Sequence, residues 1–409
     1  MSKIRIKNFG PIKDGHQDDG GWLDVKKVTL FIGNQGSGKS TIAKLISTFT
    51  WIEKALVRGD YEKEWFEKKD SLKNEYLNYH RLENYFKPNT IIEYQGDAYS
   101  IRYEKDFLTI DEVANTTSYP LPQIMYVPAE RNFIAYLKSP KELKLSSESL
   151  QGFLTEFGKA KEKMHGLQRL PVNDVDIEYI DSNDTLRLKG NDYDINLMEA
   201  SSGFQSLVPL YIVSDYLANS VKKQSENNEP MSDVERVRFQ KGVSEIMNNN
   251  NLTDRQKRDA ISAIALKFNK TTFVNIVEEP EQNLFPSSQW QMLQSLLKFN
   301  NINSGNKLIM TTHSPYLINY FTLAVKADEL KKKVYNDEEL KAKLQNIVPF
   351  DATVSSNDLA IYELDEINGS IKKLSDYKGL PSDENYLNDG LGKTNDLFVE
   401  LLNIEDQCR

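Results

Sequence analysis

The sequence is poor in cysteine and histidine, and it has no long apolar run. Of its 409 residues, one is cysteine and four are histidine. The single cysteine, Cys408, has no partner for a disulfide within the chain, which favours a reducing, cytoplasmic compartment. The few histidines leave no spacing typical of a zinc site. No apolar stretch approaches the roughly 18 residues that a transmembrane helix requires, so we expect no membrane partner.

Basic residues are outnumbered by acidic ones. The formal net charge is −9, which argues against binding nucleic acid over the whole surface. Short basic clusters such as Lys331-Lys332-Lys333 leave a local nucleic-acid groove open, although such runs are more often solvated helix faces. With 27% charged and 39% hydrophobic residues, the composition is that of a globular protein large enough for a full core and insertions.

A glycine-rich stretch at residues 33–41 fits the phosphate-loop pattern G-x-x-x-x-G-K-[ST]. An apolar, β-prone run at 28–32 precedes it, and a run with helical character at 42–46 follows it. This context brings backbone N–H groups together around phosphate oxygens. Lys39 then reaches the β- and γ-phosphates of ATP, and Ser40 ligates Mg²⁺. The predicted ATP-binding residues are Gly33, Asn34, Gln35, Gly36, Ser37, Gly38, Lys39, Ser40 and Thr41.

The rest of the chain alternates strand and helix patterns, which predicts an α/β fold. Strands are expected within residues 3–32, 124–127, 175–198, 273–277 and 307–312, with a hairpin over 91–103. Helical insertions are expected at 55–90, 140–170 and 220–270. Residues 322–409 are expected to complete the domain, with a last helix near 397–402. In the first insertion, a helix over 61–86 is predicted to stop at Pro88. The third is predicted to be a helical hairpin, because capping boxes begin at Ser232 and Thr253.

Polar residues directly follow two of the apolar strands. Glu278 and Glu279 follow the strand at 273–277, and His313 follows the strand at 307–312. Nucleotide hydrolysis needs a carboxylate that holds Mg²⁺, a second that polarises the attacking water, and a donor for the γ-phosphate. Glu278 suits the first task, Glu279 the second and His313 the third. A pair of glutamates is otherwise most often a solvated turn, but the apolar strand before this pair favours burial.

The order of these motifs resembles that of ABC-type ATPase heads, and more narrowly that of the RecF- and SMC-like branch. Four segments, at residues 6–12, 126–131, 278–286 and 311–315, are similar to bacterial ATPases of the overcoming-lysogenization-defect type. They also look like the ATPase subunits of the PARIS and Septu anti-phage systems. The resemblance covers nearly the whole chain and implies one head over residues 1–409. It implies a RecA-like core sheet with an antiparallel β lobe and short helical insertions.

The resemblance also implies how the site works. Two heads would enclose ATP, with Lys39 and Ser40 of one subunit facing a signature sequence of another. Glu279 would be the general base and His313 the switch histidine, while Ser40 and Glu278 would hold Mg²⁺. Glu278 stands where the family usually has Asp, and residues 200–204 only loosely match its signature. The signature residues would be Ser201, Ser202 and Gly203, and either Glu130 or Arg131 would take the position that senses Mg²⁺ and the γ-phosphate.

Three functions are compatible with such a head. The one we favour is an ATP-driven sensor or scaffold in an anti-phage defence complex. It would form at least a homodimer, respond to a phage-encoded trigger and control a separate effector, a nuclease, because the tail beyond Phe321 is too short for a nuclease domain. The second is a RecF- or SMC-like ATPase of DNA repair or chromosome maintenance, which would bind nucleic acid. The third, a transporter ATPase, is disfavoured by the strand-rich body.

Overall fold

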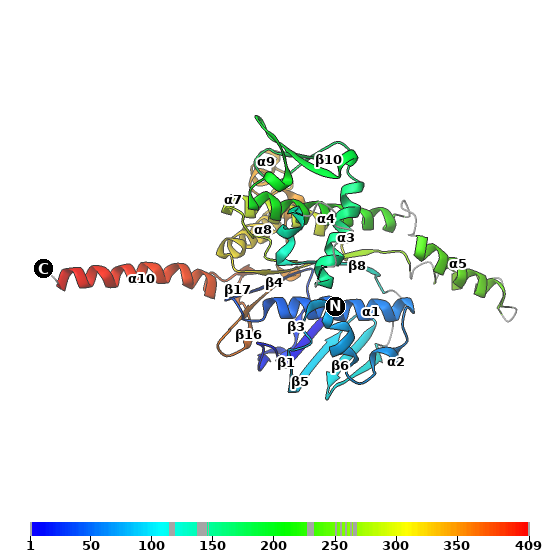
Figure 1. The fold of residues 1–409 in the computed structure, drawn as a ribbon. Helices are drawn as coiled ribbons and strands as arrows, with labels where there is room; N and C mark the ends of the chain where they lie inside the picture. The colour runs from blue at the N-terminus through cyan, green and yellow to red at the C-terminus, as the bar shows by residue number, and fades with distance from the viewer. Residues whose placement is uncertain are drawn as a thin grey trace.

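A computed structural model describes residues 2–113, 119–136, 145, 147–226, 233–249, 252, 253, 256, 257, 260, 261, 264 and 268–407. A central sheet of seven strands divides the body into two layers (Figure 1). Its strands are, in spatial order, β2 (Gly15–His16), β16 (Ser370–Lys373), β15 (Leu359–Leu364), β4 (Val28–Gly33), β14 (Lys307–Thr312), β13 (Thr272–Glu278) and β8 (Pro122–Val127). From β15 to β8 the neighbours are parallel, and β16 is antiparallel to β15.

Both faces of the central sheet are covered, so its strands are nearly continuous apolar runs. Successive side chains point to opposite faces, and each face has its own hydrophobic core. Leu30 and Met310 belong to one core, whereas Phe31 and Ile309, next to them in sequence, belong to the other. The predicted α/β class is confirmed.

The core that contains Phe31 and Ile309 also contains residues of helix α1 (Lys39–Arg58) and of an antiparallel sheet. Figure 1 shows α1 between this sheet and the central one. The hairpin predicted over residues 91–103 is formed by two of its strands, β5 and β6. In spatial order the strands are β3 (Leu23–Asp24), β1 (Lys3–Phe9), β5 (Phe86–Gln95), β6 (Tyr99–Glu104) and β7 (Phe107–Glu112).

Helices cover the other face of the central sheet (Figure 1). They are α3 (Glu148–Glu162), α4 (Ser202–Ser225), α7 (Pro286–Asn301) and α8 (Pro315–Lys333). Helix α9 (Glu338–Ile347) packs against α8 in a small separate cluster. A small antiparallel sheet lies beyond them, formed by β12 (Asp194–Asn196), β11 (Thr185–Lys189), β10 (Asp176–Ile180) and β9 (Leu167–Arg169). Strands β10, β11 and β12 lie within the range predicted at 175–198, whereas β9 lies in the segment that was predicted to be helical.

The prediction of one helix over 61–86 is wrong. Instead α2 (Lys63–Phe66) is followed by a π turn at Leu72–Tyr76 and a 3-10 turn at Asn78–His80. Asp70 and Arg81 have φ angles of 60° and 57°, and this left-handed conformation ends a helix wherever it occurs. Pro88 stops no helix, because it lies at an exposed position within β5.

The other insertions are described in part. Helix α3 accounts for the middle of the segment predicted at 140–170, of which residues 140–144 and 146 lie outside the described ranges. The first helix of the hairpin predicted at 220–270 is α5 (Asp233–Met247), although Ser232 lies outside the described ranges. Thr253 and Gln256 exchange the hydrogen bonds of the predicted capping box. Most of the second helix lies outside the described residues.

The C-terminal part completes the central sheet through β15, which pairs in parallel with β4. Its last helix, α10 (Tyr386–Gln407), is much longer than the helix predicted at 397–402 and projects from the body as an isolated helix (Figure 1). Cys408 lies outside the described residues. None of the helices in the described part of the chain combines the length and hydropathy needed to cross a membrane.

Candidate active site

The order of the central strands brings the predicted site residues to one edge of the sheet. A single strand, β14, separates the phosphate-loop strand β4 from the acid-bearing strand β13. Ile32 pairs with Thr312, and Thr311 pairs with Glu278. The residues that follow these pairs therefore leave the same edge of the sheet, where parallel α/β sheets place ligands.

The phosphate loop has the geometry that its sequence predicts. β4 is buried throughout, and α1 begins at Lys39 directly after Gly38, which has a left-handed φ of 104°. Gly33 is required at its position, because a Cβ there would lie 2.4 Å from the carbonyl oxygen of Leu364. The Ser37 hydroxyl is buried and has no hydrogen-bond partner among the described residues. A buried donor without a partner in this loop fits a bound phosphate oxygen.

Lys39 lies folded back over the loop. Its ammonium donates to the carbonyl oxygens of Gly33 at 2.9 Å and Asn34 at 2.8 Å, and it lies 3.3 Å from Nδ1 of His313. Burial lowers the pKa of Lys39 to about 8, although nearby carboxylates, Glu279 first among them, act in the opposite direction. In a complex with ATP, phosphate oxygens would take the place of these two carbonyl oxygens as partners of the ammonium.

Glu279 and His313 form the centre of the site. Nε2 of His313 lies 2.8 Å from Oε1 of Glu279. This hydrogen bond holds the pKa of Glu279 below its usual range, so the carboxylate is ionised, as a general base must be. Glu279 also has a φ of 44°, which is uncommon for a residue with a side chain and often marks a functional turn. The structure thus joins Lys39, His313 and Glu279 in one continuous series of contacts.

The two predicted Mg²⁺ ligands have different surroundings. Ser40 lies in the first turn of α1, and Glu278 is buried at the end of β13. The Glu278 carboxylate accepts a hydrogen bond from the hydroxyl of Tyr126 on β8. Among the described residues no cluster of three or more acidic, histidine or cysteine side chains could hold a metal alone. One hydroxyl and one carboxylate fit Mg²⁺, which binds few protein ligands beside phosphate and water.

Two further residues of the site escaped the sequence analysis. Glu281 is half-buried, and its Oε1 accepts hydrogen bonds from the Thr312 hydroxyl at 2.6 Å and the His313 backbone N–H at 2.8 Å. Burial raises the pKa of Glu281. Glu366 accepts a hydrogen bond of 2.8 Å from the side chain of Asn34. Glu281 lies within the segment 278–286, and its position in that motif could have identified it as a site residue. Glu366 lies in no motif, so the sequence does not indicate its position.

The predicted signature residues begin helix α4. Ser201 is its N-cap and, like Ser202, is exposed. Gly203 packs against the loop after the two acids, since a Cβ on it would lie 2.8 Å from the carbonyl oxygen of Asn283. The side chain of Asn283 in turn donates to the Ser206 hydroxyl at 3.1 Å. The signature residues and the loop at 280–285 therefore form one surface.

The prediction of Arg131 as a γ-phosphate sensor needs correction. Its side chain has no exposed surface, and it donates to the carbonyl oxygens of Glu278 at 2.7 Å and Glu279 at 2.6 Å. The remaining bonds go to the carbonyl oxygens of Ser206 and Pro128 at 3.1 and 3.3 Å. Burial lowers the pKa of Arg131 to about 10. Because its donors are taken up by backbone, Arg131 anchors the strand end and does not face a phosphate. The other candidate, Glu130, is exposed.

A comparison with protein families matches the segment that carries the two acids and His313. A family model described as an AAA ATPase domain matches residues 258–318. This segment contains β13, α7 and β14, and therefore both acids and His313. No curated protein matches the sequence.

Several solved structures are similar over most of the chain. The SMC head domain from Thermotoga maritima is 11% identical with a TM-score of 0.36, and the match covers 92% of this chain and 98% of that one. An Smc head domain from Pyrococcus furiosus, bound to a domain of ScpA, is 10% identical with a TM-score of 0.34, covering 98% and 100%. A dimeric ATP-binding cassette with ADP and inorganic phosphate is 13% identical with a TM-score of 0.31, covering 92% and 100%. The fold itself is defined by the strand order of the central sheet. The phosphate loop, the ionised Glu279 and the matched segment indicate an ATPase.

Proposed function

We propose that this chain is an ABC-type ATPase of the RecF- and SMC-like kind, which hydrolyses ATP between two copies of itself. The observation that supports the proposal best is the direct series of contacts from Lys39 through His313 to Glu279. A phosphate-binding cation and an ionised base are thereby joined by a side chain that contacts both. A glycine-rich turn without a nucleotide would require no such arrangement.

Each side chain has a task in this mechanism. Ser40 and Glu278 would hold Mg²⁺, which would neutralise charge on the β- and γ-phosphates when bound. Lys39 would leave the Gly33 and Asn34 carbonyls and bind the γ-phosphate. Glu279 would orient the attacking water and accept its proton, and His313 would donate to the γ-phosphate. Glu281 would keep His313 in place through its backbone N–H.

A second copy would complete the site. The exposed Ser201 and Ser202, with Gly203, begin α4, and a helix N-terminus is a favourable site for phosphate oxygens. Each head would thus supply its phosphate loop to one nucleotide and its signature residues to the other. ATP hydrolysis would then require at least a dimer.

We expect the ATPase rate per subunit to rise with protein concentration. Ser201→Arg should lower this rate at least tenfold, because a bulky cation would obstruct the surface that meets the neighbour's nucleotide. Lys39→Ala should abolish ATP binding by the same chain. The measurements are steady-state phosphate release over a dilution series, with mass determined alongside, and binding of a fluorescent ATP analogue.

Ser225→Arg provides the matched control, since Ser225 is exposed at the opposite end of α4. It should hydrolyse ATP like the wild type. A monomeric Ser201→Arg variant with the wild-type rate would contradict the two-subunit site. A Lys39→Ala variant that still bound ATP would contradict the nucleotide site itself.

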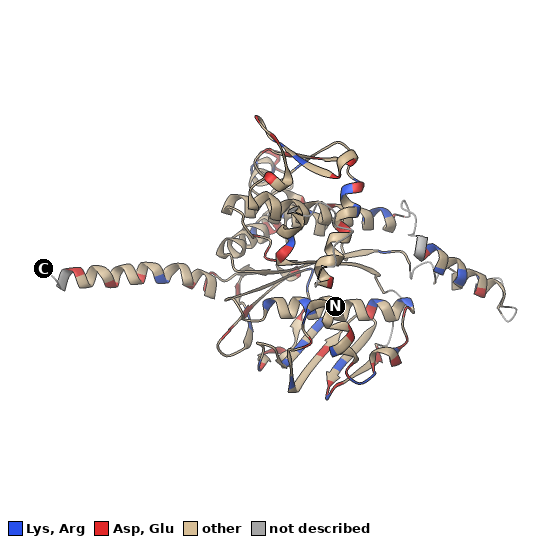
Figure 2. Cartoon of the chain, viewed as in Figure 1, with Lys and Arg blue, Asp and Glu red and all other residues tan. Residues whose placement is uncertain are grey.

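We further propose that the ATPase controls a separate effector, a nuclease, in an anti-phage defence complex with a phage-encoded trigger. The sequence resemblance supports this role, and helix α10 offers a surface for such a partner. Large apolar side chains on α10, including Leu397, Phe398 and Leu401, are exposed. Acidic residues are interspersed with them along α10, and Lys393 is the sole basic residue of the helix (Figure 2). A partner with an apolar groove and a basic rim would cover this helix best.

Leu401→Glu is expected to lower the affinity of α10 for the effector at least tenfold, because it places a charge among the exposed apolar side chains of the helix. The ATPase rate should stay within twofold of wild type. Co-purification with the proteins encoded beside this chain measures the effect. Asn403→Glu adds the same charge to the opposite side of the helix and should keep the partner. Equal partner recovery from both variants would exclude α10 as the docking surface. ATP-dependent DNA binding with a steep salt dependence would favour the DNA-repair function instead.

A further inference from the structure

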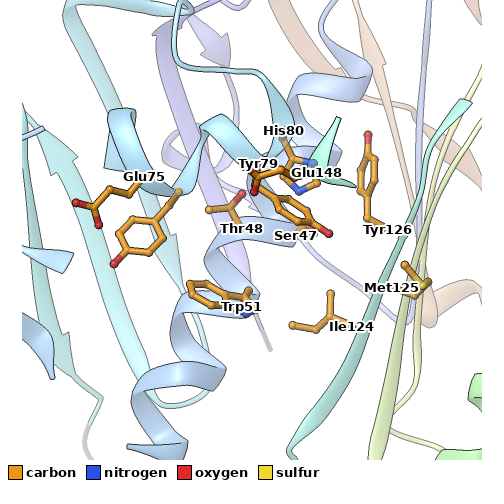
Figure 3. A pocket seen from close by; sticks show the side chains of 11 residues that line it. Ser47, Thr48, Trp51, Glu75, Tyr79, His80, Ile124, Met125, Tyr126 and Glu148 are labelled. Carbon is orange, nitrogen blue, oxygen red and sulfur yellow. The ribbon is translucent and has the colours of Figure 1, made fainter. Parts of the chain in front are cut away.

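A cavity separate from the phosphate loop opens beside β8, the edge strand of the central sheet. Its volume is about 370 Å³, and none of the residues 33–41 lines it. Figure 3 shows that its side chains come from α1, from the turns at 72–80, from β8 and from the first residue of α3. A volume of this size lies within the range of small-ligand sites.

Aromatic rings form much of the cavity wall. Trp51 and Tyr76 lie with their ring centroids 5.8 Å apart, at one side of the cavity. At the other side, the rings of Tyr79 and His80 are 4.7 Å apart, and those of His80 and Tyr126 are 4.5 Å apart. The faces of such rings carry partial negative charge and attract cations.

The charged groups among the described residues that line the cavity have one sign. Glu75 and Glu148 line it and are exposed, whereas no lysine or arginine is among the described residues that line it. Burial lowers the pKa of His80 to about 3, with Lys44 contributing in the same direction, so the imidazole is neutral. Lys44 does not line the cavity. Aromatic faces beside two carboxylates are the surroundings that organic cations prefer.

A single side chain, that of Tyr126, connects the cavity to Glu278, the proposed Mg²⁺ ligand. Tyr126 lines the cavity, and its hydroxyl donates to the Glu278 carboxylate. Its ring, in turn, contacts His80, which contacts Tyr79. A ligand that moves the Tyr126 ring would disturb the hydrogen bond that Tyr126 donates to Glu278.

We propose that this cavity binds an organic cation, an alkylammonium or guanidinium group, and that its occupancy regulates ATP hydrolysis through Tyr126 and Glu278. The regulatory part rests on the proposed function, but the binding part does not. The cation belongs either to a free polyamine or to an exposed lysine or arginine of a peptide segment. Both sources present the same charged group to Trp51, Tyr76 and the two carboxylates.

Calorimetry on the full chain without nucleotide tests the binding. The probes are spermidine and a short peptide with one central arginine. We expect at least one to bind, and Glu75→Gln/Glu148→Gln to weaken that binding at least tenfold. The matched control is Glu62→Gln/Glu64→Gln, which removes two exposed carboxylates outside the cavity and should bind like the wild type. Preference for spermidine or for the peptide identifies the source.

The ATPase rate is then measured with and without the bound probe. We expect a change of at least threefold in wild type, and none in Tyr126→Phe, which keeps the ring but loses the hydroxyl that contacts Glu278. The Glu75→Gln/Glu148→Gln variant accounts for any effect of the cation on ATP in solution. No binding, or equal binding to the variant and the control, would overturn the site. Binding that leaves the wild-type rate unchanged would overturn the regulation. Cation binding by a chain that hydrolyses no ATP would instead refute the proposed ATPase and leave the site standing.

Discussion

Glu279→Gln is expected to lower the ATP hydrolysis rate by about two to three orders of magnitude while ATP binding stays within a few fold of wild type. The amide keeps the size of the side chain and its contact with His313 at the end of β14, but it cannot accept a proton from water. Binding relies on the phosphate loop, which the substitution leaves intact. The ATP-bound form should therefore accumulate as the larger assembly. Single-turnover hydrolysis and mass determination in the presence of ATP measure both effects.

Glu366→Gln is a suitable control for this result. Glu366 also lies beside the phosphate loop, through its hydrogen bond from Asn34, but none of the hydrogen bonds of His313 to the described residues goes to Glu366. The ATP hydrolysis rate of the Glu366→Gln variant should stay within a few fold of wild type. If Glu279→Gln hydrolysed ATP normally while Glu366→Gln did not, the base would have been assigned to the wrong carboxylate.

Arg131→Ala is expected to lower the free energy of unfolding by about 3–5 kcal/mol, because several buried carbonyl groups lose their donor at once. The affected carbonyl groups include those of Glu278 and Glu279, so the acid-bearing strand end should also become disordered. Urea unfolding followed by circular dichroism measures the loss.

Arg169→Ala is the matched control for this stability measurement. Arg169 forms its ion pairs with Asp174 and Asp176 at the surface, where such pairs contribute about 1 kcal/mol or less. If Arg131→Ala unfolded like the wild type and lost only ATP binding, its guanidinium would be a phosphate ligand after all, one of the two alternatives that the sequence resemblance left open.

The phosphate loop and the strand ends could be predicted because their signals are local. Gly33 and Lys39 belong to one short pattern, and the acids and His313 each follow an apolar run whose burial is evident from composition. Parallel strands then place these ends together without further information. The sheet order that puts β14 between β4 and β13 is the step that the structure adds.

The remaining features depend on contacts that no local pattern encodes. The bond from Tyr126 to Glu278 joins two strands separated by 152 positions in the sequence. Arg131 could be a phosphate ligand or an anchor, and only its burial distinguishes the two. The helix predicted over 61–86 had suitable spacing, but Asp70 and Arg81 adopt left-handed conformations that spacing does not reveal. The length of α10 was missed because two glycines near its start, Gly390 and Gly392, weaken the helical signal.

The position of Arg131 has a consequence for communication between subunits. Its guanidinium joins Ser206, near the start of α4, to Glu278 and Glu279 at the end of β13. In the proposed dimer the start of α4 serves the neighbour's nucleotide, whereas the end of β13 serves the subunit's own. A shift at either place would be passed to the other by a rigid, buried side chain. Two ATP molecules would thus sense each other through an arginine that touches neither of them.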